Sequence, residues 1–426
     1  MGLPSDMDAG RHQIQSYTVG ISALWKQFEI QDTTKSCFKA LDSVMKIIRA
    51  TTIPKSLDVF CRGILKKLSE KYEVVALSSP GEEMQSIAER EGVRTITVPM
   101  ERHISPWKDI VALYRLIQVF RQERPTMVHS MTPKAGLLCM VAAWLTHVPV
   151  RVHTFTGLVF PTAKGFQRRL LMLTDSITCR CATYIIPEGE GVKKDLLDYG
   201  ITDKPLRVLG FGNVMGVDMH VYSRRPEVME KARLLRDEHC FTFLFVGRIV
   251  RDKGINELCE AFDQLSRENR SVRLLLVGWR EDSLDPVSEK ALGIMNSNPA
   301  ITCAGKIFGE DLLAYYAAAD CFVLPSYREG FPNTVLEAGA MDLPSIVTDI
   351  NGSREIIVEN ENGYIIPPQD GDALLAAMRR MLNDSRRRSY MASHARNMIN
   401  SRFEQGFVRQ CLFDFYDVIL DGDRHV

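Results

Sequence analysis

The nine residues EGFPNTVLE, from Glu329 to Glu337, place two carboxylates eight positions apart around a Gly-Phe-Pro turn. The apolar run 321–324 before the turn predicts a strand, and Asn333 is expected to begin a helix. The free N–H groups and the positive dipole end of such a helix suit a diphosphate. Glu337, in the first turns of the helix, would accept hydrogen bonds from two ribose hydroxyls, and Glu329 would lie nearer a sugar. The motif therefore predicts a site for a sugar nucleotide.

A second strand end carries two cations. The run FTFLFVG (241–247) predicts a strand, Arg248 follows it at once, and Lys253 precedes the next helix. Ligands bind at the carboxyl ends of the strands in an open parallel sheet, so both cations are placed to hold a leaving diphosphate. Taken alone, the acidic motif also fits a strand-to-helix turn with one solvated Glu and one Glu that complements the helix dipole. Two cations and two carboxylates on neighbouring strand ends favour the binding site.

Three segments of the second half carry a resemblance to a known family. They are GRIVRDKG (247–254), EGFPNTVLEAGAMDLPSIVTD (329–349) and NGSREII (351–357). They resemble the donor half of the retaining glycosyltransferases of family four, which have the GT-B fold. The resemblance extends into the first half through HSMTPKAGLL (129–138), VRVHTFTGLVF (150–160) and LGFGNVMGVD (209–218). The first half is similar to the branch that adds sugars to polyprenyl-diphosphate-linked saccharides in capsule, O-antigen or glycan assembly.

The order of elements predicts an α/β fold. From Met45 onward, short apolar runs alternate with amphipathic stretches such as 58–71, which is typical of parallel sheets buried under helices. We expect two doubly wound Rossmann-like domains that face each other across a cleft, as in GT-B. The expected parts are an N-terminal extension (1–44), an acceptor-binding domain (45–212), a donor-binding domain (213–402) and a C-terminal helix (403–426) that packs back on the first domain. Because MKIIRATT at Met45 has the form of a first strand after a start codon, we suspect that the extension is not native.

The resemblance also implies a mechanism and roles for single residues. In front-face displacement, the diphosphate leaves from the face of the sugar that the acceptor hydroxyl attacks. Arg248 and Lys253, with the start of the helix, would stabilise the departing diphosphate. Glu329 would contact donor sugar hydroxyls near the reacting carbon, and Glu337 would hold the ribose. The rest of the pocket is expected from Gly330, Phe331, Asn333 and Thr334.

The donor is expected to be a nucleotide diphosphate sugar with UDP as its nucleotide, and no further cofactor is predicted. No Asp-x-Asp pair lies at a strand end in a way that demands a metal, and enzymes of the resembled fold usually work without one. We therefore predict metal independence.

Acceptor contacts are expected from the first half. His129 and His153 each end a predicted apolar strand, where an imidazole would reach the cleft. A lone His is more often a structural residue, so both interpretations stay open. At two positions where relatives often have further histidines, this chain has Thr156 and Met131. Thr156 is therefore the third acceptor candidate.

Composition excludes several classes of protein. The chain has 426 residues, of which 45% are hydrophobic and 25% charged, enough for two globular domains. The ten cysteines lack a repeated paired spacing, as expected of buried thiols in a reducing compartment. Apolar runs such as 136–145 are shorter than the roughly 20 residues that cross a bilayer. A cytoplasmic protein is expected.

The charges divide unevenly along the chain. Residues 45–200 carry 22 Lys and Arg against 15 Asp and Glu, although the whole chain is neutral. A basic first half fits an acceptor side that meets an anionic surface. Lys164, Arg168 and Arg169 lie among apolar residues that include Phe160 and Phe166, a mixture that could rest on the inner face of the cell membrane. A core helix with a solvated basic edge is the alternative. No module that reads nucleic acid is found.

Other functions stay open on the sequence. The nearest is a glycosyltransferase with a soluble acceptor. A UDP-sugar 2-epimerase needs no glycosyl acceptor, and Arg248, Lys253 and the EGFPNTVLE motif argue against it. A non-catalytic subunit that binds nucleotide would be favoured by loss of Glu329 or the two cations, and all three are present. A nicotinamide dehydrogenase is disfavoured because no G-x-G-x-x-G follows the first strand.

Overall fold

Six parallel strands form the first sheet of the computed structural model, which describes residues 45–281 and 285–421. The strands are β1 (Lys46–Ala50), β2 (Glu73–Ser78), β3 (Arg94–Thr97), β4 (Met127–Met131), β5 (Val150–Phe155) and β6 (Tyr184–Pro187). Their order in the sheet is β3-β2-β1-β4-β5-β6. β1 and β4 lie at the centre and are almost wholly buried, because helices cover both faces of the sheet.

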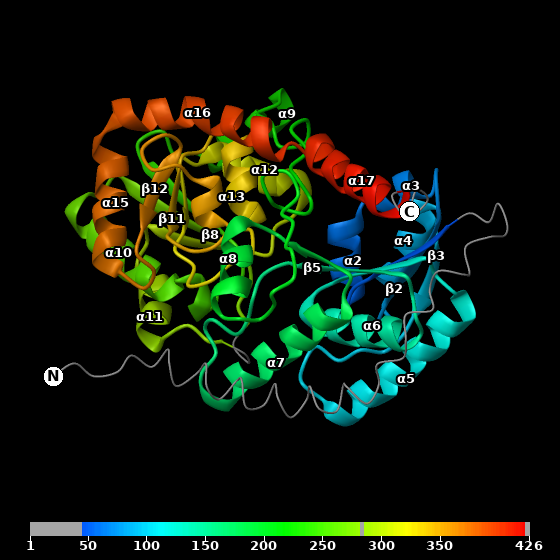
Figure 1. Cartoon of the computed structure of the whole chain (residues 1–426). Coiled ribbons are helices and arrows are strands. Elements are labelled where there is room, and N and C mark those ends of the chain that lie inside the picture. Colours follow the sequence, from blue (N-terminus) through cyan, green and yellow to red (C-terminus); the bar gives the residue numbers. More distant parts are fainter. Residues whose placement is uncertain (1–44, 282–284, 422–426) are drawn as a thin grey trace. The chain divides into compact units, whose positions relative to one another are not determined.

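The helices of the first half divide between the two faces of this sheet (Figure 1). They are α2 (Pro54–Cys61), α3 (Ile64–Leu68), α4 (Glu83–Glu91), α5 (Pro106–Glu123), α6 (Pro133–Leu145), α7 (Gly165–Cys181) and α8 (Glu190–Asp198). α5, α6, α7 and α8 share one core with the sheet, and α2, α3 and α4 share the other. The sheet is therefore doubly wound.

The predicted helix over 58–71 differs from the observed structure. α2 begins at Pro54, whose fixed φ suits the first helical position, and ends at Cys61. Gly63 then takes a φ of +71°, and α3 follows. One Gly in the left-handed region thus divides the expected helix into two short ones.

A second sheet of six parallel strands forms the other half. Its strands are β7 (Phe241–Val246), β8 (Val272–Val277), β9 (Ile301–Gly305), β10 (Cys321–Leu324), β11 (Ser345–Thr348) and β12 (Gly363–Ile366). Their order is β12-β11-β10-β7-β8-β9, so β7 and β10 are neighbours. The ends of β7 and β10 carry the two predicted parts of the site, and the sheet places them side by side. Two doubly wound domains were expected, and this is confirmed.

The helices of the second half surround this sheet. They are α9 (Pro226–Leu235), the 3₁₀ turn η2 (Arg251–Lys253), α10 (Ile255–Glu268), α11 (Glu289–Ser297), α12 (Gly309–Ala318), α13 (Asn333–Ala340), α14 (Ser353–Ile356), α15 (Gly371–Asn383), α16 (Ser385–Phe403) and α17 (Gln405–Asp421). One hydrophobic core joins the sheet to α9, α10, α12, α13, α15 and α16.

The last helix returns to the first sheet. In Figure 1, α17 lies beside α3 and α4, away from the second sheet. Leu412, Phe415 and Tyr416 pack into the core that contains Ile47 of β1. α17 begins at Gln405, two residues later than expected, because α16 extends to Phe403. The end of the chain thus ties the second half to the first.

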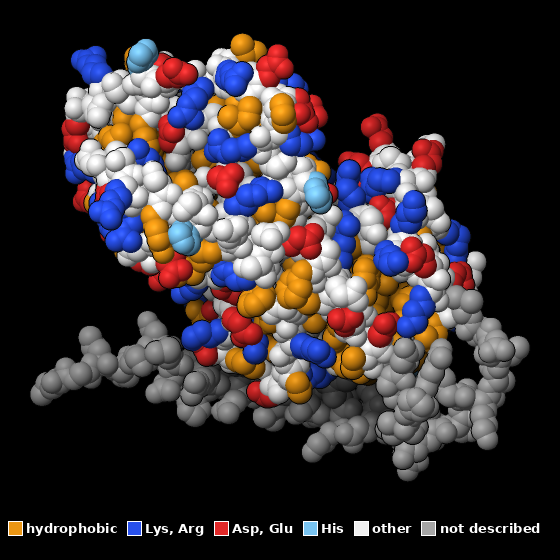
Figure 2. Space-filling model, turned by 90° about the horizontal axis from the view of Figure 1, so that it is seen from above, with side chains coloured by type: hydrophobic (Ala, Val, Ile, Leu, Met, Phe, Trp, Pro, Cys, Tyr) orange, Lys and Arg blue, Asp and Glu red, His pale blue; other side chains and the backbone are white. Residues whose placement is uncertain are grey.

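The described helices and one face of the surface bear on membrane spans and on nucleic-acid binding. Within 45–281 and 285–421, no helix is both long and apolar enough to cross a membrane. Figure 2 shows Lys and Arg side chains interspersed with Asp and Glu over one face, a pattern typical of a solvated surface. The predicted extension, 1–44, lies outside the described residues.

Candidate active site

The carboxyl ends of the two sheets meet at the turn that carries Glu329. At the next residue, Gly330, a Cβ would lie 2.4 Å from the backbone oxygen of Thr156, in the loop after β5. At Gly157, where φ is +116°, a Cβ would lie 3.0 Å from the Cα of Gly330. These distances leave no room for a side chain at Gly330. Backbone contact between the two domains therefore bounds the predicted cleft beside Glu329.

Glu329 and Lys253, predicted separately from two motifs, are in direct contact. Lys253 donates a hydrogen bond to Oε1 of Glu329, and the Ser326 hydroxyl donates to the same oxygen at 2.7 Å. The Lys253 and Glu329 side chains are only 18% and 13% exposed, so water screens this ion pair weakly. As far as the described residues go, both hydrogen bonds reach Oε1. Oε2 is left to accept a hydroxyl.

Gly254 permits this contact. Its φ is +70°, and a Cβ there would lie 2.0 Å from the backbone oxygen of Pro325, just after β10. The adjoining loops are also joined by Tyr327, whose N–H donates to the Asp252 oxygen at 2.8 Å. The turn after β7 can therefore lie against the end of β10, which carries Lys253 to Glu329.

Arg248 lies at the end of β7, as predicted, and already has a carboxylate partner. It donates a hydrogen bond to Glu281 at 2.6 Å, and its side chain is 35% exposed. The neighbouring strand end is packed so closely that a Cβ at Gly278 would lie 1.7 Å from the Gly247 oxygen. A diphosphate would therefore share Arg248 with Glu281 or displace that carboxylate.

The start of α13 has free backbone donors. Pro332 is the N-cap residue and has no side-chain acceptor, and among the described residues nothing accepts from the N–H groups of Asn333 and Thr334. The side chain of Asn213, in the connection between the domains, donates to Oδ1 of Asn333 at 2.9 Å. Two N–H groups at the positive end of a helix form an anion site. A diphosphate contact by this helix stays a prediction.

Glu337 lies one turn into α13 and has a protein partner. The Tyr316 hydroxyl donates to its Oε2 at 2.8 Å. Burial raises the pKa of Glu337, while hydrogen bonds from Tyr316 and Tyr222 act in the opposite direction. The Tyr316 hydroxyl thus orients the carboxyl group of Glu337 by its Oε2 and makes no hydrogen bond to its Oε1. A ribose contact by Glu337 stays a prediction.

Two protein-family models match the two halves of the chain. Residues 58–212 match a glycosyl transferase 4-like domain, and residues 229–398 match the glycosyl transferases group 1. The capsular polysaccharide biosynthesis glycosyltransferase CapM of Staphylococcus aureus is 31% identical over 379 residues, which are 88% of this chain and 97% of CapM. The chain belongs to the group 1 glycosyltransferases.

Two further likenesses bear on this glycosyltransferase. The UDP-Gal:alpha-D-GlcNAc-diphosphoundecaprenol alpha-1,3-galactosyltransferase of Escherichia coli is 29% identical over 74% of this chain and 81% of its own. The crystal structure of Anabaena Alr3699/HepE in complex with UDP matches with a TM-score of 0.73 at 16% identity, covering 88% of this chain and 100% of that one. The second likeness is one of fold, and it confirms the GT-B architecture.

The two histidines predicted to contact the acceptor are buried inside the first domain. His129 and His153 are each 1% exposed. Nε2 of His129 is 2.7 Å from the Thr154 hydroxyl, and Nδ1 of His153 is 2.9 Å from the Ser130 hydroxyl. Burial lowers the pKa of His153 to about 3, so its imidazole is neutral at physiological pH. The imidazoles do not open onto the cleft as expected, and an acceptor contact by either stays a prediction.

His129 belongs to a polar cluster that anchors α17. The Arg49 guanidinium is 1% exposed and lies 3.2 Å from His129, 2.7 Å from the Tyr416 hydroxyl and 3.1 Å from the Met131 sulfur. Met131, where relatives often have a His, thus contacts a buried cation. Moving α17 away would take the Tyr416 hydroxyl from the buried Arg49 guanidinium, which favours the return of the last helix to the first sheet.

Sequence reasoning missed several residues around the site. Ser326 contacts Glu329, Asn213 contacts Asn333, and the Glu355 carboxylate accepts from the N–H groups of Glu190 and Gly191 in the other domain. Glu188 lies one residue after β6. The rule that drew attention to Arg248, a charge directly after an apolar strand, would also have found Glu188.

No group of three or more His, Cys, Asp or Glu side chains could hold a metal ion in the ranges that the structure describes. Metal independence stays a prediction.

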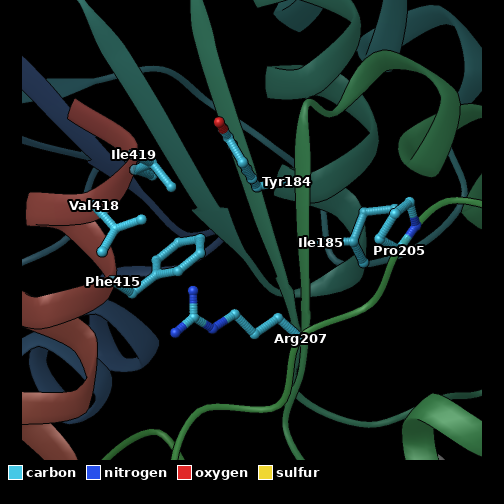
Figure 3. Close-up of a pocket in the computed structure, with 7 residues that line it drawn as sticks. All are labelled: Tyr184, Ile185, Pro205, Arg207, Phe415, Val418 and Ile419. Atoms are coloured by element: carbon cyan, nitrogen blue, oxygen red, sulfur yellow. The ribbon is translucent and has the colours of Figure 1, made fainter. Parts of the chain in front are cut away.

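A cavity of about 230 Å³ lies away from these residues, between β6 and α17 (Figure 3). Phe415, Val418 and Ile419 of α17 line one side, and Arg207 extends toward the Phe415 ring, with 5.6 Å between its guanidinium and the ring centroid. Because Tyr184 is the first residue of β6, the cavity lies near the amino end of that strand, whereas Glu329 lies at the carboxyl ends of the strands. It contains none of the predicted site residues.

Proposed function

We propose that this glycosyltransferase moves a sugar from a UDP-sugar to a polyprenyl-diphosphate-linked saccharide, with retention of configuration and without a metal ion. One observation carries the proposal: the Lys253–Glu329 ion pair lies at the end of β10, beside the free N–H groups of α13 and near Arg248. These groups offer fixed positive potential to a leaving diphosphate and a carboxylate oxygen to a sugar.

The reaction needs little covalent chemistry from the protein. The bond between C1 of the sugar and the diphosphate oxygen breaks, and a bond from C1 to the acceptor oxygen forms on the same face. The acceptor hydroxyl gives its proton to the departing diphosphate. Arg248, Lys253 and the α13 N–H groups stabilise that leaving group, while Glu329 positions the sugar by its hydroxyls.

The identity of the donor and acceptor draws support from relatives. The printed name of the E. coli relative states a UDP-Gal donor and a diphosphoundecaprenol-linked acceptor. The Anabaena structure contains UDP. A transferase with a soluble acceptor is the second candidate, and the acceptor experiment below separates the two.

The first experiment offers the purified protein a panel of UDP- and GDP-sugars. We expect one UDP-sugar to raise the melting temperature and to be hydrolysed slowly, and Glu329→Ala to lose that hydrolysis. With this donor, a polyprenyl-diphosphate-linked saccharide should be glycosylated faster than the same free saccharide. The product anomer, assigned by NMR, should match that of the donor, and EDTA should leave the rate unchanged.

Each arm can fail separately. A well-folded protein that binds no donor would contradict the proposal that this site transfers a sugar from a nucleotide. Preference for the free saccharide would favour the soluble acceptor. An inverted anomer would refute front-face displacement, and inhibition by EDTA that added Mg²⁺ reverses would refute metal independence.

We further propose that the first domain rests on anionic lipid. Phe166 at the start of α7 is 80% exposed, and Trp107 and Tyr114 on α5 are 77% and 61% exposed. Lys164 and Arg169 beside Phe166 are also exposed. Phe160, counted with this surface from the sequence, is instead fully buried. Exposed aromatic residues beside cations are typical of interfacial helices.

Vesicle binding tests this surface. We expect the protein to co-sediment with vesicles that contain phosphatidylglycerol and not with phosphatidylcholine vesicles. Phe166→Ser together with Trp107→Ser should weaken binding by roughly 10-fold or more, because each change removes an exposed aromatic side chain that would insert into the lipid. Leu234→Ser, at an 86% exposed position on α9 of the other domain, is the matched control. Equal binding by both variants would contradict the proposal.

A further inference from the structure

Glu188 is a buried carboxyl group for which the described residues provide no partner. It is 4% exposed and follows the last residue of β6. Its backbone is fixed on both sides: its N–H donates to the Phe155 oxygen at 3.0 Å, and its own carbonyl accepts from the Asn213 N–H at 2.7 Å. Throughout 45–281 and 285–421, no hydrogen bond or ion pair reaches the Glu188 carboxyl group. A carboxyl group in a residue that is only 4% exposed is unfavourable without a protein partner, so its presence calls for an explanation.

The carboxyl group lies against the turn that follows Glu329. A Cβ at Gly330 would be 2.9 Å from Oε2 of Glu188. The same Cβ would be 2.4 Å from the Thr156 oxygen, so Glu188 lies where the two domains touch. It is therefore a neighbour of the residue that is proposed to hold the donor sugar.

The charged groups that face Glu188 are both carboxylates. Glu329, from the loop before α13, is held by Lys253 and Ser326. Glu355, on α14, accepts hydrogen bonds from the N–H groups of Glu190 and Gly352 at 2.6 and 3.1 Å. Both neighbours are acceptors in these contacts, so neither donates a hydrogen bond to Glu188.

Burial, followed by the charges of Glu355 and Glu329, raises the pKa of Glu188 well above its ordinary range. The direction of this shift favours the protonated form, which carries one O–H donor. In the same region, Glu329 accepts hydrogen bonds from Lys253 and Ser326. One carboxyl group that donates and one that accepts could together hold two hydroxyls of a sugar.

We propose that Glu188 is a sugar-binding residue, which donates a hydrogen bond from its carboxyl group to a hydroxyl of the glycosyl unit that is transferred. This inference rests on the proposed function and extends it. In this arrangement the oxygen of one sugar hydroxyl accepts the hydrogen bond from Glu188, and Glu329 accepts one from a neighbouring hydroxyl. A sugar that lacks the contacted hydroxyl would leave Glu188 unpaired, so this residue contributes to donor specificity.

Two substitutions test the proposal. Glu188→Gln keeps a hydrogen-bond donor of the same shape and cannot ionise, whereas Glu188→Leu removes the donor. We expect Gln to keep kcat/KM for the donor within about threefold and Leu to lower it by roughly 10- to 100-fold. The parent should lose activity as rising pH ionises Glu188, and the Gln variant should lack that part of the fall. Both variants should melt at or above the parent temperature, because each removes a buried acid.

Deoxy donors locate the contact. For the parent, kcat/KM should be lower with the donor that lacks the contacted hydroxyl than with the complete donor. For Glu188→Leu, kcat/KM should be the same with both donors. Glu190→Gln, two residues away with an exposed side chain, should behave as the parent in every assay. UDP alone should bind all variants equally, because the contact is to the sugar.

The outcomes separate this inference from the proposed function. A parent without donor turnover would contradict the proposed function itself. An active parent with an equally active Leu variant and an unchanged pH profile would overturn the role of Glu188 alone. Equal losses in the Gln and Leu variants, with the parental pH profile, would show a structural role and would also overturn it.

Discussion

Lys253→Ala is expected to lower kcat for sugar transfer by about 10²–10³, the cost of removing one preorganised charge from a developing anion. Lys253 holds Glu329 by Oε1, and under the proposed function it also faces the diphosphate. Its loss should therefore lower kcat more than it raises the KM for the donor, since the charge on the leaving group is greatest in the transition state.

Initial rates of UDP release test this expectation. Lys290→Ala is the matched control, because Lys290 pairs with Glu260 on the surface and is 68% exposed. Combining Lys253→Ala with Glu329→Gln should cost much less than the sum of the two single losses, because each residue acts through the other. A Lys253→Ala enzyme within threefold of the parent, or fully additive losses, would refute the shared role.

Gly254→Ala is expected to lower the free energy of unfolding by roughly 3 kcal/mol or more and to abolish transfer. The φ of +70° alone costs a residue with a Cβ about 1–2 kcal/mol. The Cβ would also lie 2.0 Å from the Pro325 oxygen, so the turn after β7 would have to move away from the end of β10. That movement would separate Lys253 from Glu329.

Urea unfolding and donor hydrolysis measure the two effects. Gly293→Ala is the control: Gly293 lies inside α11, and a Cβ there meets nothing within 4 Å. This change should be neutral or stabilise by about 0.5–1 kcal/mol. Equal unfolding midpoints for both variants would contradict the close approach of Gly254 to the Pro325 oxygen. If Gly254→Ala is stable but inactive, its effect comes from the changed position of Lys253 and not from lost stability.

Much of the architecture was predictable because it depends on local patterns. Apolar runs of strand length, separated by amphipathic helices, predict parallel sheets, and both sheets are present. The strand 321–324 and the helix start at Asn333 were predicted to the residue, since a buried apolar run and a Pro just before a helix are strong local signals. The prediction of one helix over 58–71 was wrong because Gly63 has a left-handed backbone conformation, which the neighbouring residues do not indicate.

The sequence by itself determined which residues stand at the strand ends: Arg248, Lys253, Glu329 and the start of α13. Only the tertiary structure decided their partners. Lys253 contacts Glu329, which lies 76 residues later in the sequence, and Arg49 contacts Tyr416, which lies 367 residues later. No local pattern encodes these contacts. Burial is likewise a property of the whole fold, and it closes His153 within the first domain and raises the pKa of Glu188. Periodicity determines elements, whereas desolvation and long-range contact determine the chemistry of the side chains that those elements bring together.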